Sequence, residues 1–430
     1  MGIFGEAAPF RHDFAAAGGP ATASARLEVG SMHRRRLRWL FVSLLAATLV
    51  LVEMLNWNNP SKPYASAPAF CSIAAPAQRS PEITPSESLS AALLSYKALQ
   101  ECYGGPKGSY LAPYTGMAAA WPESQALSAT LALAGVDAAS DSIRSSIAQS
   151  IAVLQNYWDP KGGYFPNGRW FSTGIGVKKF DDNAWLGLDL VRAYAITHNP
   201  SYLNQAEAVA SFEATGWSKN EHFAIPGGIF WQEPAYGSHR NAVSTAGAAF
   251  LNARLYAITR TGLYKNRAEK YLHWTVSALT LKNGLIGDQI SPSGRVSKNI
   301  WSYNQGLVID TYTSLYGTTK NPYDLAAAEL LAERSLTYLN SQQRLEHQPQ
   351  VFDSIYLRSL AHLYAVVPNS DYVRTMQSYA TYLYQRMDRS TGVIRIGPMT
   401  SPSTGWLLTQ AAATQIFTMY ANIAGHSRRA

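Results

Sequence analysis

The stretch RAYAITHNPSYL, residues 192–203, decides the fold, because it ends one helical pattern and begins the next. Its Asn-Pro pair is a turn former, and the two tyrosines that flank it lie eight positions apart. Related stretches follow at 254–264, 314–323 and 362–372, with tyrosine spacings of eight, seven and eight. Each places turn-forming residues between helical patterns, so the chain is predicted to repeat a helix–turn–helix unit.

Amphipathic spacing along the chain predicts about twelve helices. We expect them at 88–102, 122–135, 139–157, 181–197, 201–214, 241–260, 263–280, 301–317, 321–341, 350–366, 370–387 and 402–423. Short strand patterns occur near 228–232 and 393–396. Six hairpins predict an all-α fold, an (α/α)6 barrel or toroid with short irregular loops at the rim of the site. An open superhelical array is the alternative, but about 50–60 residues per hairpin favours closure.

Three segments are expected along the chain. In the first, 1–57, an arginine-rich stretch directly precedes an apolar run from Trp39 to Val52. That run is shorter than the ~20 residues that span a bilayer, so it reads as a secretory signal peptide or as a membrane anchor. Residues 58–87 are rich in Pro, Ser and Ala and are expected to be a linker. The barrel should occupy 88–424, and the first segment predicts export to the medium, the periplasm or the cell surface.

The composition allows a large core and gives little sign of a nucleic-acid partner. Of 430 residues, 47% are hydrophobic and 15% are charged. The net charge is +8, but the only dense basic cluster is the N-terminal one, so no nucleic-acid binding is expected. Cys71 and Cys102 would pair in an exported chain, and two buried thiols are the alternative. The sequence has no CxxC, HExxH or Cys/His cluster, and no metal or other cofactor is expected.

Two adjacent aspartates, Asp181 and Asp182, open the aromatic-rich pattern FDDNAW. Their Cα atoms must lie about 3.8 Å apart, so one carboxyl should gain affinity for a proton while the other loses it. That difference suits a general acid/base and a nucleophile acting on a glycosidic bond. Helix capping is the alternative, because Asp at a helix start accepts free backbone N–H groups and favours the positive end of the helix dipole.

Loops and helix starts hold candidates for sugar binding. In the segment PGGIFW, Gly228 would allow close backbone approach and Trp231 would stack on a sugar; a tight turn with a core Trp is the alternative. Asn241 and Ser244 would bond sugar hydroxyls, although capping is the more ordinary role of Asn241. Asp288 is a further candidate for substrate binding, and a turn or solvated residue is a more ordinary interpretation than a catalyst. The remaining candidates for substrate binding are Asn183, Trp185, Tyr303, Asn304 and Gln305.

Five ordered motifs resemble those of glycoside hydrolase family 76, the α-1,6-mannanases. The family patterns are Asp-Asp-x-x-Trp, Gly-Gly-(aliphatic)-x-Trp, Lys-Asn-x-x-Ser, aromatic-Asn-Gln-Gly and Phe-x-x-Ile-x-x-Arg. The matching segments are 181–185, 227–231, 240–244, 303–306 and 352–358. The resemblance covers roughly residues 88–423. Two departures bear on substrate detail: Arg240 stands where Lys is usual, and Asp353-Ser354 where Lys-Gly is commoner.

The resemblance implies a six-hairpin barrel that cleaves α-1,6-linkages of α-mannan or mannose-containing oligosaccharides with retention. It assigns Asp181 as the nucleophile and Asp182 as the general acid/base. The spacing agrees, because retaining enzymes need carboxyls about 5–5.5 Å apart and inverting ones about 6.5–9.5 Å. Transglycosylation of cell-surface mannans and a non-catalytic glycan-binding toroid are the alternatives. A magnesium motif of the form Asp-Asp-x-x-Asp is incomplete, because Trp185 holds its fifth position. We expect a monomer that touches a membrane only through an N-terminal anchor.

Overall fold

The computed structural model describes residues 82–111, 117–136, 141–167, 177–233, 239–394, 396 and 404–427, all within one compact unit. The predicted signal or anchor segment and most of the predicted linker lie outside the described residues. The described part contains twelve α-helices: α2 (Pro85–Tyr103), α3 (Ala120–Ala134), α4 (Asp141–Leu154), α5 (Phe180–Thr197), α6 (Pro200–Thr215), α7 (Ala242–Thr259), α8 (Gly262–Leu279), α9 (Ser302–Thr319), α10 (Pro322–Asn340), α11 (Gln350–Tyr364), α12 (Ser370–Tyr384) and α13 (Thr404–Ser427). Their edges agree with the predicted spans to within a few residues.

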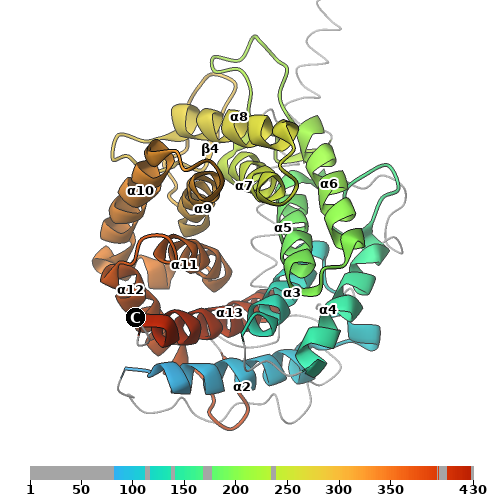
Figure 1. Ribbon diagram of the computed structural model, residues 1–430, viewed down its shortest axis with the longest axis vertical. Coiled ribbons are helices and arrows are strands. Elements are labelled where there is room, and N and C mark those ends of the chain that lie inside the picture. The colour runs from blue at the N-terminus through green and yellow to red at the C-terminus, as the bar shows by residue number, and fades with distance from the viewer. Residues whose placement is uncertain are drawn as a thin grey trace, which may run out of the picture. The chain divides into compact units, whose positions relative to one another are not determined.

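The helices form two concentric rings, as predicted (Figure 1). The inner ring consists of α3, α5, α7, α9, α11 and α13; each contacts the next, and α13 contacts α3. In the outer ring, α4, α6, α8, α10 and α12 each pack on the inner helix that precedes them, and α2 packs on α13. The first helix therefore covers the last one. This contact closes the toroid and excludes the open superhelical array.

Small residues allow the inner helices to approach one another closely. A Cβ atom added to Gly187 in α5 would lie 2.6 Å from a methyl carbon of Leu251 in α7. One added to Gly247 in α7 would lie 2.9 Å from the Cβ of Ala184 in α5. An inner helix is buried by its two ring neighbours and by its outer partner, which explains why α7 is so rich in Ala.

The two ends of the barrel are connected differently. Short turns pass from an inner helix to its outer partner, and in three of them the inner helix ends in the left-handed conformation: His198, Arg260 and Lys320, with φ of 56°, 58° and 60°. The predicted Asn-Pro turns are present, and in them Asn199 and Asn321 cap the following outer helices with their side chains. Longer connections lead from outer to inner helices, so the N-termini of the inner helices gather at a loop-rich rim. These loops are longer than the short rim loops expected.

Small β-ladders tie the rim loops together. The strand β1 (Lys178–Lys179) pairs antiparallel with β2 (Gln232–Glu233), and β3 (Arg240–Asn241) pairs antiparallel with β4 (Gln289–Ile290). The strand predicted near 228–232 forms isolated bridges and the start of β2. The one predicted near 393–396 is a single bridge between Met387 and Ile394. The predicted strands are therefore only contacts between loops, and the fold is all-α.

Two further features bear on the N-terminal predictions. Cys102, in α2, forms a disulfide. The chain has one other cysteine, Cys71, which lies outside the described residues. Among the residues that the structure describes, no helix combines the length and the apolar character that crossing a bilayer requires.

Candidate active site

The aspartate pair occupies the first turn of α5 at the loop-rich rim. The N-cap of this helix is Lys179, whose side chain makes no capping bond, so neither aspartate is the N-cap. Asp181 still satisfies one free donor of the first turn, because its Oδ1 accepts the backbone N–H of Asp182 at 3.0 Å. Both side chains are half-buried. The capping and catalytic interpretations are thus compatible at this position.

Trp231 positions the Asp181 carboxylate. Its indole Nε1–H donates to Asp181 Oδ2 at 3.0 Å, and its backbone carbonyl accepts the N–H of Phe180 at 2.9 Å. The Lys179 ammonium lies 4.5 Å from the centre of the indole ring. The β1–β2 ladder holds this arrangement, because it aligns the start of α5 with the segment after Gly228. The Gly-Gly-x-x-Trp motif therefore acts on the dyad directly, and Trp231 is more than a candidate stacking residue.

The pKa of Asp181 is raised by burial, although the Lys179 charge and the Trp231 N–H oppose the shift. Close carboxyl groups titrate as a unit, so the pair retains a shared proton to higher pH than an isolated aspartate would. A singly protonated pair supplies one acid and one base at the same time.

Glu213 is a third carboxyl beside the pair, and the sequence analysis missed it. It lies in α6, is fully buried, and neither Oε atom has a hydrogen-bond partner. Its pKa is raised well above the usual value, first by burial and then by the charges of Asp181 and Asp182. The available signal was a charged residue at a core-facing position of an outer helix.

The opposite wall of the rim comes from α9 and the loop before it. Tyr303 is nearly buried, and its pKa is raised well above the usual value by burial and by the charges of Asp288 and Asp181. Asp288 is half-buried, with a weak contact of 3.5 Å from Asn304 Nδ2 to its Oδ1. Burial raises the pKa of Asp288 as well. Asp288 is therefore not a freely solvated turn residue. Tyr303 lies within electrostatic reach of Asp288 and of Asp181.

A repeated bond fastens the rim loops to the inner helices. In five inner helices, a polar side chain near the N-terminus accepts a backbone N–H from the preceding loop. The pairs are Glu123 with Tyr110, Asn183 with Tyr164, Thr245 with Ile229, Gln305 with Ile286 and Gln410 with Ile394, at 2.6–3.0 Å. We call these the loop-fastening bonds. Each loop residue also forms a β-bridge near the end of the preceding outer helix, so the bond anchors the loop at both sides.

Two predicted substrate-binding amides belong to this series. Asn183 is fully buried, and its amide group bonds to backbone atoms of Tyr164 and Lys179. Gln305 is fully buried and bonds to backbone atoms of Ile286 and Trp301. The structure thus gives both amides a structural role in place of the one predicted for them. The motifs located the site, but they did not distinguish residues that build it from residues that face it.

The other predicted residues divide in the same way. Asn241 caps α7 by accepting the N–H of Ser244 at 3.3 Å, which is the ordinary role considered for it. The hydroxyl of Ser244 and the Oδ1 of Asn304 are buried without partners. Gly228 has φ of 81°, and a Cβ there would lie 2.3 Å from the Trp274 ring, so this position requires glycine.

Trp185 and Arg240 also have structural contacts. Trp185 is 5% exposed and lies 6.5 Å from the Tyr303 ring between centroids. Arg240, which replaces the usual Lys, donates to the carbonyls of Ile225 and Gly227 at 2.6 and 2.9 Å. These two bonds therefore hold the Gly-Gly turn in place. In the described part of the chain, no group of three or more His, Cys, Asp and Glu side chains is arranged to bind a metal ion.

Comparison with known proteins identifies the family. The model of glycosyl hydrolase family 76 matches residues 86–415, most of the chain. The chain belongs to glycosyl hydrolase family 76. The resemblance inferred from the five motifs is thereby confirmed, and this family 76 protein has its aspartate pair within the matched region.

Three relatives illustrate the match. The protein is 27% identical over 189 residues to the mannan endo-1,6-alpha-mannosidase DCW1 of Saccharomyces cerevisiae, covering 40% of each chain. A family 76 glycoside hydrolase from a bovine Bacteroides thetaiotaomicron strain has a TM-score of 0.68 at 23% identity, covering 78% of this chain and 77% of that one. An inactive variant of an α-1,6-mannanase from Salegentibacter sp. HEL1_6, with two aspartates replaced by asparagine and α-1,6-mannotriose bound, has a TM-score of 0.62 at 18% identity, covering 78% and 99%. These structural likenesses show the fold.

Proposed function

We propose that this family 76 protein is a retaining glycoside hydrolase that cleaves α-1,6-mannosidic linkages, with α-mannan or its oligosaccharides as substrate. The observation that carries the proposal is the half-buried aspartate pair at the rim of the barrel, with Asp181 held by the Trp231 indole. The related mannanase loses activity when two aspartates are replaced and is seen with an α-1,6-mannotriose, which supports the same assignment. Export by way of the N-terminal segment belongs to the proposal as well.

In the first step, Asp181 attacks the anomeric carbon of the mannosyl unit. Asp182 gives its proton to the glycosidic oxygen as the bond between carbon and oxygen breaks. The products are a mannosyl ester on Asp181 and a free leaving-group sugar. The two N–H donors on Asp181, from Trp231 and from the backbone of Asp182, fix the carboxylate before attack, so little reorganisation is needed.

In the second step, Asp182 acts as a base. It removes a proton from a water molecule, whose oxygen attacks the anomeric carbon, and the ester bond to Asp181 breaks. The carboxylate leaves into the same pair of N–H donors, which favours its ionised form. The buried Glu213 keeps its proton throughout, because a third negative charge beside the pair would be strongly disfavoured.

The test is the stereochemistry and linkage of the first product. Proton NMR of fresh reactions with an α-1,6-mannan should show the α-anomer first, with the β-anomer appearing only by mutarotation. First-formed β product would contradict the retaining mechanism. No cleavage of α-1,6-mannan, alongside cleavage of an α-1,2- or α-1,3-mannan, would contradict the linkage. Longer oligosaccharides in place of free sugar would assign the protein as a transglycosylase.

A further inference from the structure

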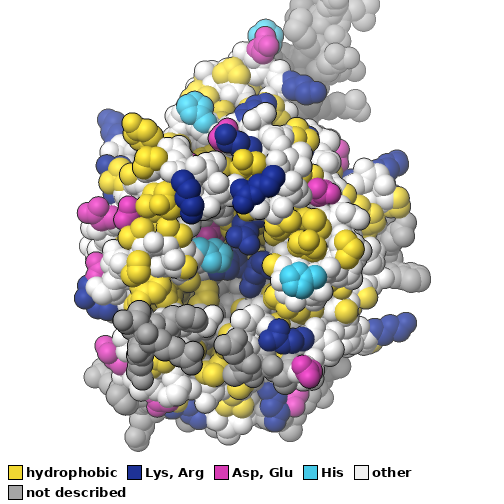
Figure 2. Space-filling model, viewed as in Figure 1, with side chains coloured by type: hydrophobic (Ala, Val, Ile, Leu, Met, Phe, Trp, Pro, Cys, Tyr) yellow, Lys and Arg dark blue, Asp and Glu magenta, His cyan; other side chains and the backbone are white. Residues whose placement is uncertain are grey.

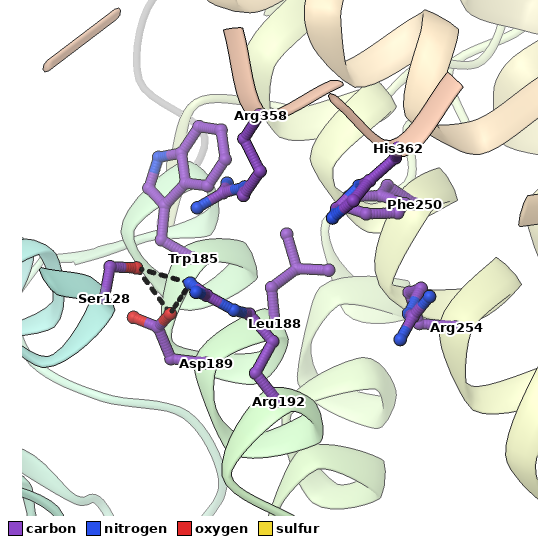
Figure 3. Close-up of a pocket in the computed structure, with 9 residues that line it drawn as sticks. All are labelled: Ser128, Trp185, Leu188, Asp189, Arg192, Phe250, Arg254, Arg358 and His362. Carbon is purple, nitrogen blue, oxygen red and sulfur yellow. Dashed lines mark hydrogen bonds and ion pairs between the residues drawn. The ribbon is translucent and has the colours of Figure 1, made fainter. Parts of the chain in front are cut away.

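A cavity lined partly by basic side chains lies farther along the inner ring from the aspartate pair. Arg192 of α5, Arg254 of α7, and Arg358 and His362 of α11 line it together with Trp185 (Figure 3). The space-filling view shows a hollow near the middle of the ring, bordered by Lys or Arg side chains and a His (Figure 2). Asp181 and Arg192 lie eleven residues apart on one helix, about 16 Å along its axis. Arg192 therefore lies well away from the aspartate pair, whereas Trp185, one turn after the pair, borders the cavity.

The sequence repeat itself builds this cavity. Arg192, Arg254 and His362 occupy the same position in their repeats, two residues before the first tyrosine of each stretch. Because the ring places equivalent residues at equivalent heights around one axis, three basic side chains converge (Figure 3). Arg358 lies one turn before His362 on α11 and adds a fourth.

The charges in the cavity are only partly balanced. Arg192 Nη1 lies 3.4 Å from Asp189 Oδ1, and His362 Nδ1 lies 2.7 Å from Asp310 Oδ1. Within the described part of the chain, the structure gives neither Arg254 nor Arg358 a hydrogen bond or an ion pair. Arg358 is only 8% exposed and its guanidinium reaches into the cavity. Asp189 lies within electrostatic reach of Arg358 but forms no ion pair with it. A buried cation that lacks hydrogen bonds is costly, so the Arg358 side chain is poised for an anion.

The arginines also act on one another. Burial and the charge of Arg358 lower the pKa of Arg192 to about 10, although Asp189 opposes the shift. Burial and Arg358 likewise lower the pKa of Arg254, with Asp310 opposing. With a pKa of about 10, Arg192 remains charged at neutral pH. Three mutually repelling cations facing two paired carboxylates leave a positive field in the cavity.

Helix dipoles do not account for this cluster. Cations favour the negative end of a helix, but that effect fades within the last turn. Arg192 and Arg254 lie five residues before the ends of their helices, and Arg358 lies six before the end of α11. The three arginines therefore precede the last turn of their helices, and a bound anion accounts for their position better than the helix dipole does.

The size of the cavity limits what it can hold. Its volume is about 40 Å³, and one water needs roughly 10–15 Å³ on the same measure, so there is room for about three waters. A tetrahedral oxyanion fits this space, whereas a whole sugar ring would have to lie outside it. Arginine is the residue best suited to such an anion, because its planar fork can donate two parallel hydrogen bonds.

We propose that this cavity binds the oxyanion of a phosphate group, held chiefly by Arg254 and Arg358. The phosphate is either inorganic or a phosphomonoester whose remaining part extends through the open side of the cavity. Arg192 and His362 complete the positive lining. The site is independent of the dyad at the rim.

Calorimetric titration of the full chain with inorganic phosphate at constant ionic strength tests this site. We expect saturable binding of one phosphate per chain, weakened about ten- to hundredfold by Arg254→Gln, because each charge-assisted bond contributes that much. Arg358→Lys, which keeps the charge but loses the fork, should weaken binding less than Arg358→Gln. The matched control, Arg144→Gln on the exposed face of α4, should bind as the unaltered chain does.

Further arms of the titration separate the ligand sources. Mannose 6-phosphate binding more tightly than inorganic phosphate, with no binding of mannose, would assign a phosphomonoester; the reverse order would assign free phosphate. Asp181→Asn should leave phosphate binding intact. The proposal is overturned if neither phosphate binds, if Arg254→Gln binds as tightly as the unaltered chain, or if binding disappears with Asp181→Asn.

Discussion

The two ends of the inner ring carry opposite chemistry on the same helices. At the rim, the first turn of α5 presents Asp181 and Asp182 beside the buried Glu213. Three turns further along α5, Arg192 joins Arg254 at the far end. The difference shows that a closed repeat fold brings equivalent residues together at two levels, because the inner helices surround a common axis.

Burial acts on both ends in opposite directions. It raises the pKa of Asp181 and Glu213 at the rim and lowers that of Arg192 and Arg254 at the far end, since in each case it disfavours the charged form. At the rim the result is a carboxyl pair that retains a proton for acid/base chemistry. At the far end Arg192 pairs with Asp189, whereas Arg254 and Arg358 make no hydrogen bond or ion pair within the described part of the chain.

The largest expected effect is a loss of activity on replacing an aspartate at the rim but not one at the short-turn end. Asp181→Asn should lower kcat on α-1,6-mannotetraose by at least about 10³-fold, because the amide cannot act as the nucleophile. Its control is Asp324→Asn, an aspartate in the first turn of α10 beside the short-turn end. That variant should keep kcat within about twofold. Equal loss in both, or normal turnover in Asp181→Asn, would remove the functional difference between the ends.

Trp231→Phe keeps an aromatic ring but removes the indole N–H that donates to Asp181. We expect kcat/KM to fall about 10- to 100-fold, the size of a hydrogen bond to a charged group. Because that bond lowers the pKa of Asp181, its loss should shift the acidic limb of the pH–rate profile to higher pH. Trp274→Phe is the matched control, since its indole N–H bonds to Pro226 in the same loop at 2.7 Å. If Trp274→Phe shifts the acidic limb of the pH–rate profile by a similar amount, the shift does not come from the bond between Trp231 and Asp181.

The fold was predictable from particular residues because the repeat is local. The Asn-Pro and Thr-Gly turns after Tyr194 and Tyr256 set the helix boundaries, and turn chemistry depends on neighbouring residues alone. The dyad was predictable because adjacency in sequence guarantees adjacency in space.

Other features were not predictable, because they depend on three-dimensional neighbours. The core-facing position of Glu213 was visible in the sequence, but its closeness to Asp181 and Asp182 was not, because that depends on how α6 packs. The backbone partners of Asn183 and Gln305 belong to loops whose approach only the folded chain defines. The arginine cavity had a sequence signal, the shared repeat position of Arg192, Arg254 and His362, but its meaning required the ring.

A stability comparison contrasts the fastening of the two ends. Asn183→Ala at the rim should cost about 3 kcal/mol of unfolding free energy, because it leaves buried backbone groups unpaired. Asn321→Ala at the short-turn end removes an exposed helix cap and should cost about 1 kcal/mol. Urea unfolding of both variants at pH 7 measures the difference. Equal costs would mean that the loop-fastening bond contributes no more than a surface cap.

A pH-dependent effect on stability concerns Glu213. The folded state retains its proton above the unfolded pKa of about 4.3, so the native protein loses stability as pH rises through that window. Glu213→Gln lacks this penalty, so its Tm relative to the unaltered chain should rise between pH 4 and pH 8. Glu123→Gln in α3 is a second test with the same expected sign, because burial raises the pKa of that carboxyl to about 8 although it accepts a backbone N–H. A flat Tm difference for Glu213→Gln would show that this carboxyl ionises freely.

The loop-fastening bonds have a consequence for how such barrels diversify. Glu, Asn, Thr and Gln all serve the same geometric purpose in different repeats, so the joint tolerates many acceptors. Everything between one joint and the next can then change in length or composition without disturbing the ring. Grafting a foreign segment between two such joints offers a route to new glycan preferences on an unaltered scaffold.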